Sequence, residues 1–171
     1  MSQSRQRQPL TYRSRTLQPG SERAADTHPL TWRLRDDGET VWLDEYLRKD
    51  GYQAVRKALS EGDPQTVIAT MKKANVRGRG GAGFSAGVKW SLTLKGSGHP
   101  RGYLGCNADE MEPGTFKDRL LMEQQPHLLI EGMILAAWAN NSRYGYVFLR
   151  GEYVEAARSL NRAIEEARQA G

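Results

Sequence analysis

The second half of the sequence alternates between segments typical of strands and segments typical of helices. Residues 103–106 predict a short buried strand, and residues 144–149 predict a clearer one. An apolar helix is expected at 128–138, opened by a proline, and an amphipathic helix at 153–170. This order of strand, helix, strand and helix implies parallel strands joined by a right-handed crossover. The predicted fold class is therefore α/β, Rossmann-like, with parallel strands and flanking helices.

The first half predicts a helical segment ahead of the sheet. Apolar residues gather from Leu30 onward, and helices are expected at 52–59 and 66–74. Asp63 and Pro64 supply a cap and a first-turn proline for the second of these. A short helix is expected at 84–92, and Thr115 with Asp118 resembles a capping box for a helix that ends at Met122.

Composition favours one folded domain of 28–171 behind a disordered extension of 1–27. The chain has 171 residues, of which 38% are hydrophobic and 26% charged, as in globular proteins. The extension is rich in Arg, Ser and Gln, so an organelle transit peptide is the alternative to disorder. It carries most of the net charge of +5, and the rest of the chain mixes acids with bases. Nucleic-acid binding is therefore not expected.

Cysteine count and hydropathy exclude further classes. Cys106 is the only cysteine, so the chain forms no internal disulfide, and we expect no metal site in it. The longest apolar stretch, residues 128–139, is interrupted by Glu131 and is too short to span a bilayer. The three histidines are separated in sequence, and none is assigned a catalytic role.

A glycine-rich segment offers backbone donors beside a positive charge. Gly78, Gly80, Gly81, Gly83 and Gly87 lie within ten residues and are followed by Lys89, a pattern suited to cradling phosphate. The first, second and fourth of these match G-x-G-x-x-G, but the dinucleotide fingerprint requires a preceding strand and a later acid, and both are missing. No Walker A lysine is present either. A plain surface turn remains the alternative.

A second segment gathers polar side chains after the first predicted strand. Asn107, Asp109, Glu110 and Glu112 offer acceptors for hydroxyl groups and ring nitrogens. Helix capping and solvated charge are the alternative uses of such residues. Because open α/β sheets bind ligands at the carboxyl ends of their strands, the two segments together predict a nucleotide or flavin site.

Several longer motifs strengthen this prediction. They are Gly78-Arg-Gly-Gly-Ala-Gly-Phe84, Lys89-Trp-Ser91, Cys106-Asn-Ala-Asp-Glu-Met-Glu-Pro-Gly-Thr115, Lys117-Asp-Arg119, Pro126-His127 and Arg150-Gly-Glu-Tyr153. In this order they resemble the NADH- and FMN-binding flavoprotein subunit of respiratory complex I, NADH:quinone oxidoreductase, in its bacterial form. The resemblance runs from about residue 27 to Gly171 and identifies 28–171 as the N-terminal part of the NADH/FMN-binding domain.

The resemblance also implies roles for individual residues. FMN and NAD(H) are the implied cofactors, with the glycine segment and Lys89 approaching phosphate and flavin, and Phe84 stacking on the NADH adenine. Glu112, the residue assigned to the catalytic centre, would lie beside the nicotinamide. The implied cofactor-binding residues are Gly78, Arg79, Gly80, Gly81, Ala82, Gly83, Phe84, Lys89, Asn107, Asp109 and Glu110.

The implied partners are the 2Fe-2S subunit and the large iron–sulfur subunit of the peripheral arm, on the cytoplasmic side of the cell membrane rather than in a mitochondrion. Leu92 departs from relatives that carry a second phenylalanine there. The family's 4Fe-4S ligands are absent, and the chain ends on a helix, as a truncated domain would. Alternatives are a diaphorase subunit of an NAD-linked hydrogenase or formate dehydrogenase, or a non-catalytic nucleotide-binding or assembly module.

Overall fold

The computed structural model describes residues 30–93 and 102–171, and the unit that carries the fold spans Arg33–Gly171. The extension predicted at 1–27, together with His28 and His99, lies outside the described residues. The helices and strands are α1 (Leu43–Arg48), α2 (Gln53–Glu61), α3 (Pro64–Lys73), α4 (Ala86–Ser91), β1 (Gly102–Ala108), α5 (Lys117–Gln124), α6 (Pro126–Ala139), β2 (Ser142–Leu149) and α7 (Val154–Ala170).

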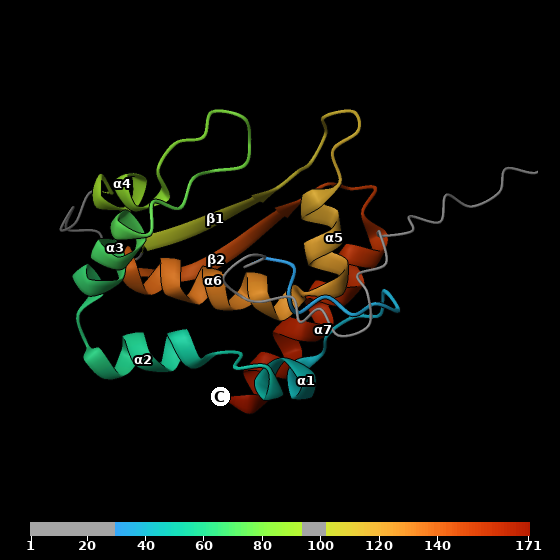
Figure 1. Ribbon diagram of the computed structural model, residues 1–171, viewed down its shortest axis with the longest axis horizontal. Helices are drawn as coiled ribbons and strands as arrows, with labels where there is room; N and C mark the ends of the chain where they lie inside the picture. Colours follow the sequence, from blue (N-terminus) through green and yellow to red (C-terminus); the bar gives the residue numbers. More distant parts are fainter. Residues whose placement is uncertain (1–29, 94–101) are drawn as a thin grey trace, which may run out of the picture. The chain divides into compact units, whose positions relative to one another are not determined.

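The two strands form a parallel pair, as predicted. Their register runs from Gly102 opposite Ser142 to Ala108 opposite Leu149. Helices α5 and α6 together form the crossover between the strands, and α7 leaves the end of β2 (Figure 1). The α/β class predicted from the sequence is confirmed.

Helices α6 and α7 cover only one face of this pair. Ala108, Met122, Ala156 and Leu160 form the buried cluster on that side, with Val147 and Leu149 packed against it. The opposite face carries exposed aromatic rings, which are Tyr103, Tyr144, Tyr146 and Phe148. The expectation of a buried first strand was therefore wrong, because side chains alternate between faces and only the face toward α6 is covered.

The helices of the first half follow the predicted pattern with two differences. The Asp63 carboxylate accepts a hydrogen bond from the Gln65 amide at 2.9 Å and caps α3, as expected. Helix α1 was not predicted, since it is six residues long and its N-cap forms no side-chain hydrogen bond. Gly87 allows α4 to pack closely against α3 and is not part of a phosphate loop. A Cβ atom at Gly87 would lie 2.5 Å from the backbone nitrogen of Lys72 in α3.

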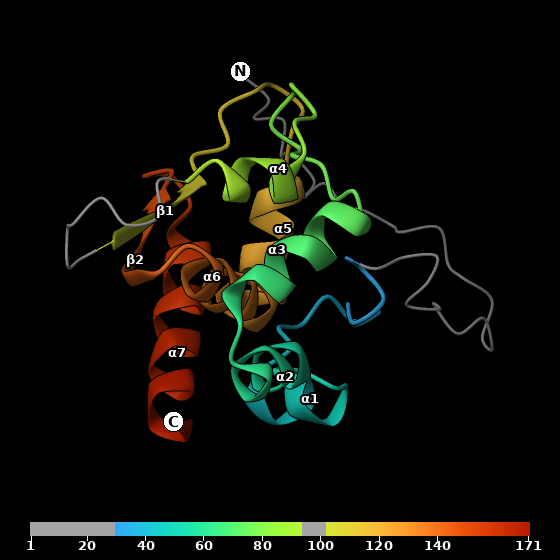
Figure 2. The same ribbon diagram turned by 90° about the vertical axis from the view of Figure 1, so that its left-hand side faces the viewer.

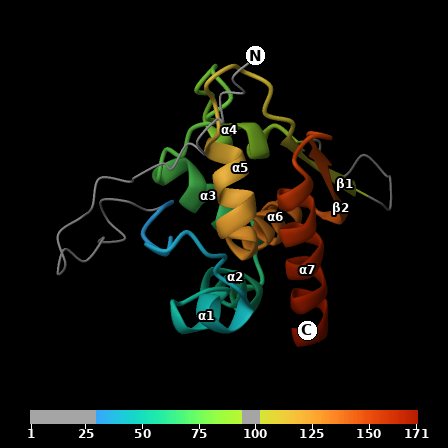
Figure 3. The ribbon, with the colours of Figure 1, turned by 90° about the vertical axis from the view of Figure 1, so that its right-hand side faces the viewer.

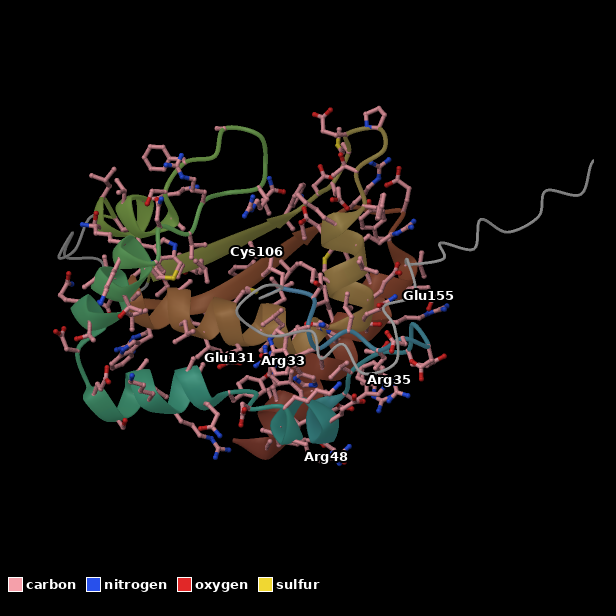
Figure 4. The ribbon with its side chains drawn as sticks, viewed as in Figure 1. Arg33, Arg35, Arg48, Cys106, Glu131 and Glu155 are labelled. Carbon is pink, nitrogen blue, oxygen red and sulfur yellow. The ribbon has the colours of Figure 1, made fainter. Side chains whose placement is uncertain are left out.

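A buried polar network ties the α1–α2 segment to α6 and α7. Tyr46 Oη donates to Glu131 at 2.5 Å, and the Tyr52 amide donates to the same carboxylate oxygen at 2.9 Å. His127, which is fully buried, lies 2.9 Å from Tyr52 Oη through Nδ1 and 3.0 Å from Glu166 through Nε2. Figure 4 shows Glu131 between α6 and the α1–α2 segment, and Figure 3 shows α1 beside α7. His127 is thus held in the interior of the unit by partners from two different segments.

This network predicts a pH-dependent stability. Burial lowers the pKa of His127 more than the Glu166 carboxylate raises it, so the unfolded chain takes up a proton before the folded one does. The contribution of His127 to the free energy of unfolding is therefore complete above its usual pKa of about 6.5 and lost as the pH falls below that value. Urea denaturation between pH 7.5 and 5 is expected to show this loss, and His127→Gln, whose amide can donate to Glu166 and accept from Tyr52, is expected to flatten the profile.

A wild-type slope that persists in His127→Gln would contradict the assignment. The Glu166 carboxylate, whose pKa lies below its usual range, acts in the same direction but only at lower pH.

None of the helices in the described ranges, 30–93 and 102–171, is long and apolar enough to cross a bilayer.

Candidate functional site

Two loops from different parts of the chain line one pocket. The glycine loop, residues 77–85, connects α3 to α4, and the acidic loop, residues 109–116, connects β1 to α5. Both rise on the same side of the unit (Figures 1 and 2). The two-loop pocket has a volume of about 770 Å³, within the usual range of ligand sites. Its lining residues are Arg79, Gly80, Gly81, Asn107, Asp109, Glu110, Met111, Glu112, Thr115, Lys117 and Asp118.

The glycine loop is closed at its base. The Gly78 amide donates to the Phe84 carbonyl at 2.9 Å, the Ala86 amide donates to the Val76 carbonyl at 2.8 Å, and Arg77 and Ser85 form an isolated antiparallel bridge. Two positions within the loop require glycine, since Gly81 has φ +115° and Gly83 has φ +63°. A Cβ atom at either would point into open space. At these two positions no neighbouring atoms cover the backbone of the loop.

The acidic loop is shaped by two local contacts. Asn107 Oδ1 accepts from the Asp109 amide at 3.1 Å and turns the chain as it leaves β1. Further on, the Thr115 amide donates to the Glu112 carbonyl at 3.1 Å across Pro113 and Gly114, the latter with φ +77°. Proline followed by a left-handed glycine is the sequence that a type II turn favours. These two turns bring Asp109 and Glu112 to the same wall of the pocket.

Glu110 anchors the acidic loop to the first turn of α5. Its side chain is buried, and its carboxylate accepts from the amides of Asp118 at 3.0 Å and Arg119 at 3.2 Å. Burial alone would raise the pKa of Glu110, but these two amides and the Lys117 ammonium group outweigh it and lower the pKa. Glu110 is therefore an ionised helix cap, placed at the positive end of the helix dipole.

The capping box expected at Thr115 and Asp118 does not form, and that prediction was wrong. Helix α5 begins at Lys117, after Phe116, and the Glu110 carboxylate takes the place of a local cap. A carboxylate from outside the helix reaches two amides at once, which the Thr115 hydroxyl could not do.

Sequence reasoning gave no role to two further residues of the site, Arg150 and Tyr153. Arg150 Nη1 donates to the Glu110 carbonyl at 2.8 Å, and Tyr153 Oη lies 3.2 Å from both this carbonyl and the Glu110 carboxylate. Both follow β2, whose end adjoins the end of β1 in a parallel sheet. The motif Arg150-Gly-Glu-Tyr153 is the sequence feature that could have identified these two residues. Local sequence patterns assigned no function to it.

The walls of the two-loop pocket differ in character. One wall presents glycine backbone and the Arg79 guanidinium, which suit a phosphate group. The other presents Asn107 and the carboxylates of Asp109 and Glu112, which suit hydroxyl and ring N–H groups. Lys117 is paired with Asp118 at 2.8 Å and with Glu110 at 3.4 Å. The residues present therefore fit a ligand with a phosphate at one end and a polar ring at the other, as FMN has.

Not every predicted site residue lines this pocket. Gly78, Ala82 and Gly83 belong to the glycine loop but lie outside the lining, and Phe84 is 54% exposed. Lys89 is exposed on α4 and is also absent from the lining. The structure thus brings together Arg79, Gly80, Gly81, Asn107, Asp109, Glu110 and Glu112. Their roles as ligand contacts stay predictions.

Two other features carry no comparable chemistry. An apolar groove of about 710 Å³ lies between α6, β2 and α7, where carboxylates are missing from the lining formed by the described residues. Burial raises the pKa of the Cys106 thiol, which opposes a role as a nucleophile. Across the described part of the chain, no group of three or more metal-ligating side chains gathers.

Comparison with known proteins agrees with these observations. Residues 71–171 match the family model of the Nuo51 FMN-binding domain (Complex1_51K). The chain is 60% identical over 149 residues to the F subunit of the NADH-quinone oxidoreductase of Salmonella typhimurium, and equally to that of Escherichia coli. In each case 87% of this chain is covered.

Among solved structures, an NAD+-reducing [NiFe]-hydrogenase in its air-oxidised state matches with a TM-score of 0.64 and 38% identity. The match covers 78% of this chain and 23% of the hydrogenase chain. The chain spans 34% of the length of the Salmonella and Escherichia proteins. Since the family model covers more than half of the sequence, the chain belongs to the Nuo51 FMN-binding domain family of complex I flavoproteins.

Proposed function

We propose that this chain forms the N-terminal part of an NADH- and FMN-binding flavoprotein subunit of NADH:quinone oxidoreductase, and that the two-loop pocket receives FMN. The observation that carries the proposal is the convergence of the glycine loop and the acidic loop on one pocket. Segments about twenty-five residues apart in sequence meet there, with donors on one wall and acceptors on the other. A plain surface turn would not require this pairing.

In this proposal the two walls divide the work of binding. The Gly80 and Gly81 amides and the Arg79 side chain, which line the pocket, take the phosphate, while Asn107 and Asp109 accept hydrogen bonds from the flavin. Lys89, which lies outside the lining, approaches the ligand only if α4 or the glycine loop shifts on binding. Glu110 contributes through the loop that it anchors to α5. When bound, FMN supplies the acceptance of a hydride from NADH and the release of single electrons to iron–sulfur clusters. The protein residues orient the flavin and tune its reactivity, and no protein acid or base is required.

The substrate side of the proposal rests on Phe84 and Glu112. Phe84 is exposed at the end of the glycine loop, where its ring can stack on the adenine of NADH. Glu112, exposed in the acidic loop, lies beside the nicotinamide. Leu92 is 69% exposed and offers no second aromatic ring, so the stacking clamp is one-sided.

The matched hydrogenase raises a diaphorase subunit of an NAD-linked hydrogenase as an alternative, but its identity of 38% is well below the 60% shared with the NADH-quinone oxidoreductase relatives. This difference supports complex I as the parent enzyme. In this proposal the partners are the 2Fe-2S subunit and the large iron–sulfur subunit, and the assembly is peripheral to the cell membrane on its cytoplasmic side.

Flavin binding tests the proposal directly. A full-length subunit that contains this sequence is expected to purify with the visible absorbance of bound flavin and to bind FMN in a titration followed by quenching of flavin fluorescence. The same titration on the 171-residue chain measures what the two loops contribute alone. Lack of FMN binding by the full-length subunit would contradict the proposal and favour a non-catalytic assembly module.

The 171-residue chain alone is expected not to turn over NADH with ferricyanide, because it spans only 34% of the length of its relatives in NADH-quinone oxidoreductase. The rate is measured with pure chain and added FMN, against the full-length subunit at the same concentration. Turnover by the chain alone at the rate of the full-length subunit would show that the two loops suffice.

Glu112→Gln is expected to weaken NAD⁺ relative to NADH. The nicotinamide ring is positive in NAD⁺ and neutral in NADH, so a nearby carboxylate favours the oxidised form by about 1 kcal/mol, or about fivefold in affinity. The dissociation constants of both nucleotides are compared for wild type and variant in a full-length subunit at fixed salt. An affinity ratio that does not change, or that moves toward NAD⁺, would return Glu112 to the role of a solvated loop charge.

A further inference from the structure

The segment that follows β2 also supports the acidic loop. Arg150, the residue after β2, donates to the Ala108 carbonyl from its amide at 3.3 Å and to the Glu110 carbonyl from Nη1 at 2.8 Å. The Tyr153 amide in turn donates to the Arg150 carbonyl at 3.0 Å, which fixes the two residues relative to each other. The segment that follows β2 therefore adds support to the local turns of the loop and to its anchor on α5.

The contacts leave Glu110 little freedom in either its main chain or its side chain. Its carbonyl has two donors within reach, Arg150 Nη1 and Tyr153 Oη, while its carboxylate meets the α5 amides and the same tyrosine. The Tyr153 ring is itself flanked by the guanidinium groups of Arg119 and Arg150, at 5.9 and 5.8 Å from its centroid. A shift of Tyr153 would therefore change its contacts with Glu110 and with both guanidinium groups.

Fixing the Glu110 carbonyl also fixes the peptide group that follows. Peptide bonds here are all trans, so the Met111 N–H points away from the direction of the Glu110 carbonyl and hence away from Arg150. Asp109, Met111 and Glu112, on both sides of Glu110, line the two-loop pocket. A rotation of this peptide would move acceptors and donors of the pocket together.

From this geometry we infer that Arg150 and Tyr153 are positioning residues for the flavin, acting through Glu110 on the orientation of the acidic loop. The inference rests on the proposed function, since it assumes that the two-loop pocket receives FMN. Neither residue lines the pocket, so both are expected to act on the ligand without touching it. Their effect is transmitted by the Glu110 main chain, and it is expected in the binding and the spectrum of the flavin.

Variants in a full-length subunit that contains this sequence test the inference. Arg150→Gln and Tyr153→Phe each remove donors to Glu110 and are expected to raise the dissociation constant of FMN about tenfold, because hydrogen bonds from charged or buried donors contribute on this scale. Both are also expected to shift the visible absorption bands of the bound flavin, which respond to the hydrogen bonds around the ring. Arg150→Lys, which keeps a charged donor, is expected to fall between wild type and Arg150→Gln.

Glu152→Gln is the matched control. Glu152 accepts from Arg150 Nε and Nη2, its side chain is largely exposed, and as a carboxylate it donates no hydrogen bond to Glu110. This variant is expected to keep both the FMN affinity and the spectrum of wild type. The melting temperature of each FMN-free protein is measured in parallel, so that a loss of binding can be compared with a loss of stability.

Two outcomes would overturn the inference. One is wild-type FMN affinity in Arg150→Gln and Tyr153→Phe. The other is weaker binding that tracks a lower melting temperature while the bound flavin keeps its wild-type spectrum, which is the behaviour of a purely structural contact. Gly81→Val in the same experiment separates this failure from that of the proposed function, because it must abolish FMN binding if the pocket is the flavin site. If Gly81→Val also bound FMN normally, both the proposed function and the inference would fall.

Discussion

Replacing Gly81 with valine is expected to reduce FMN affinity by at least about a hundredfold in a full-length subunit that contains this sequence. Gly81 has φ +115°, a conformation that strains any branched residue by about 1–3 kcal/mol. No atom lies within 4 Å of its Cβ position and Gly81 lines the two-loop pocket, so we expect a branched side chain there to reduce the space for the ligand. The two effects add, and fluorescence titration of FMN measures their sum.

Gly80→Ala separates the two causes. Gly80 lines the same pocket and also has open space at its Cβ position, but its φ is not in the left-handed region. A loss of FMN in Gly80→Ala identifies close approach of the ligand as the main requirement, whereas retention identifies the backbone conformation at Gly81. Unchanged affinity in Gly81→Val itself would remove the glycine loop from the site.

Gly51→Ala is expected to have the largest effect on stability, a loss of about 3 kcal/mol in the free energy of unfolding. A Cβ atom at Gly51 would lie 2.1 Å from Tyr46 Cδ1 and 2.5 Å from the Tyr46 carbonyl oxygen. The Tyr46 ring is fully buried and its hydroxyl is bound to Glu131 at 2.5 Å, so it cannot move aside. Thermal unfolding of the 171-residue chain should show a melting temperature lower by about 10 °C.

Gly132→Ala provides the comparison for this variant. Gly132 lies within α6, is exposed, and has no atom within 4 Å of its Cβ position. Alanine there is expected to raise the free energy of unfolding by up to about 1 kcal/mol, since glycine is a poor helix former. If Gly51→Ala were as stable as wild type, the α1–α2 segment would pack more loosely than its contacts indicate.

Much of the fold could be predicted from local patterns. The aromatic run of β2, the amphipathic period of α7 and the Asp63-Pro64 start of α3 are signals contained within a few residues, and the structure confirms them. Helix α1 lacks such a signal. The covered and open faces of β1 could not be distinguished either, because they depend on where α6 and α7 pack.

The candidate site, like the fold, could be predicted only in part from the sequence. The spacing of glycines and polar residues pointed to both loops, but the main partners of Glu110 came from more distant parts of the chain. Glu110 caps a helix eight and nine residues ahead, and its carbonyl is bound by Arg150, forty residues on. The His127 network likewise joins residues 39 to 85 positions apart. Such pairings depend on tertiary packing, which no local pattern encodes.

The closed base of the glycine loop changes the entropy of binding. A free chain as rich in glycine as residues 78–84 would lose roughly 1–2 kcal/mol of backbone entropy for each residue that a ligand orders. Here the Gly78–Phe84 and Ala86–Val76 hydrogen bonds set the separation of the loop ends during folding, before any ligand arrives. Ordering at the moment of binding is then confined to the few residues at the tip. The glycine loop therefore presents its amides to a ligand after most of its backbone entropy has already been lost on folding, although its sequence is typical of a mobile segment.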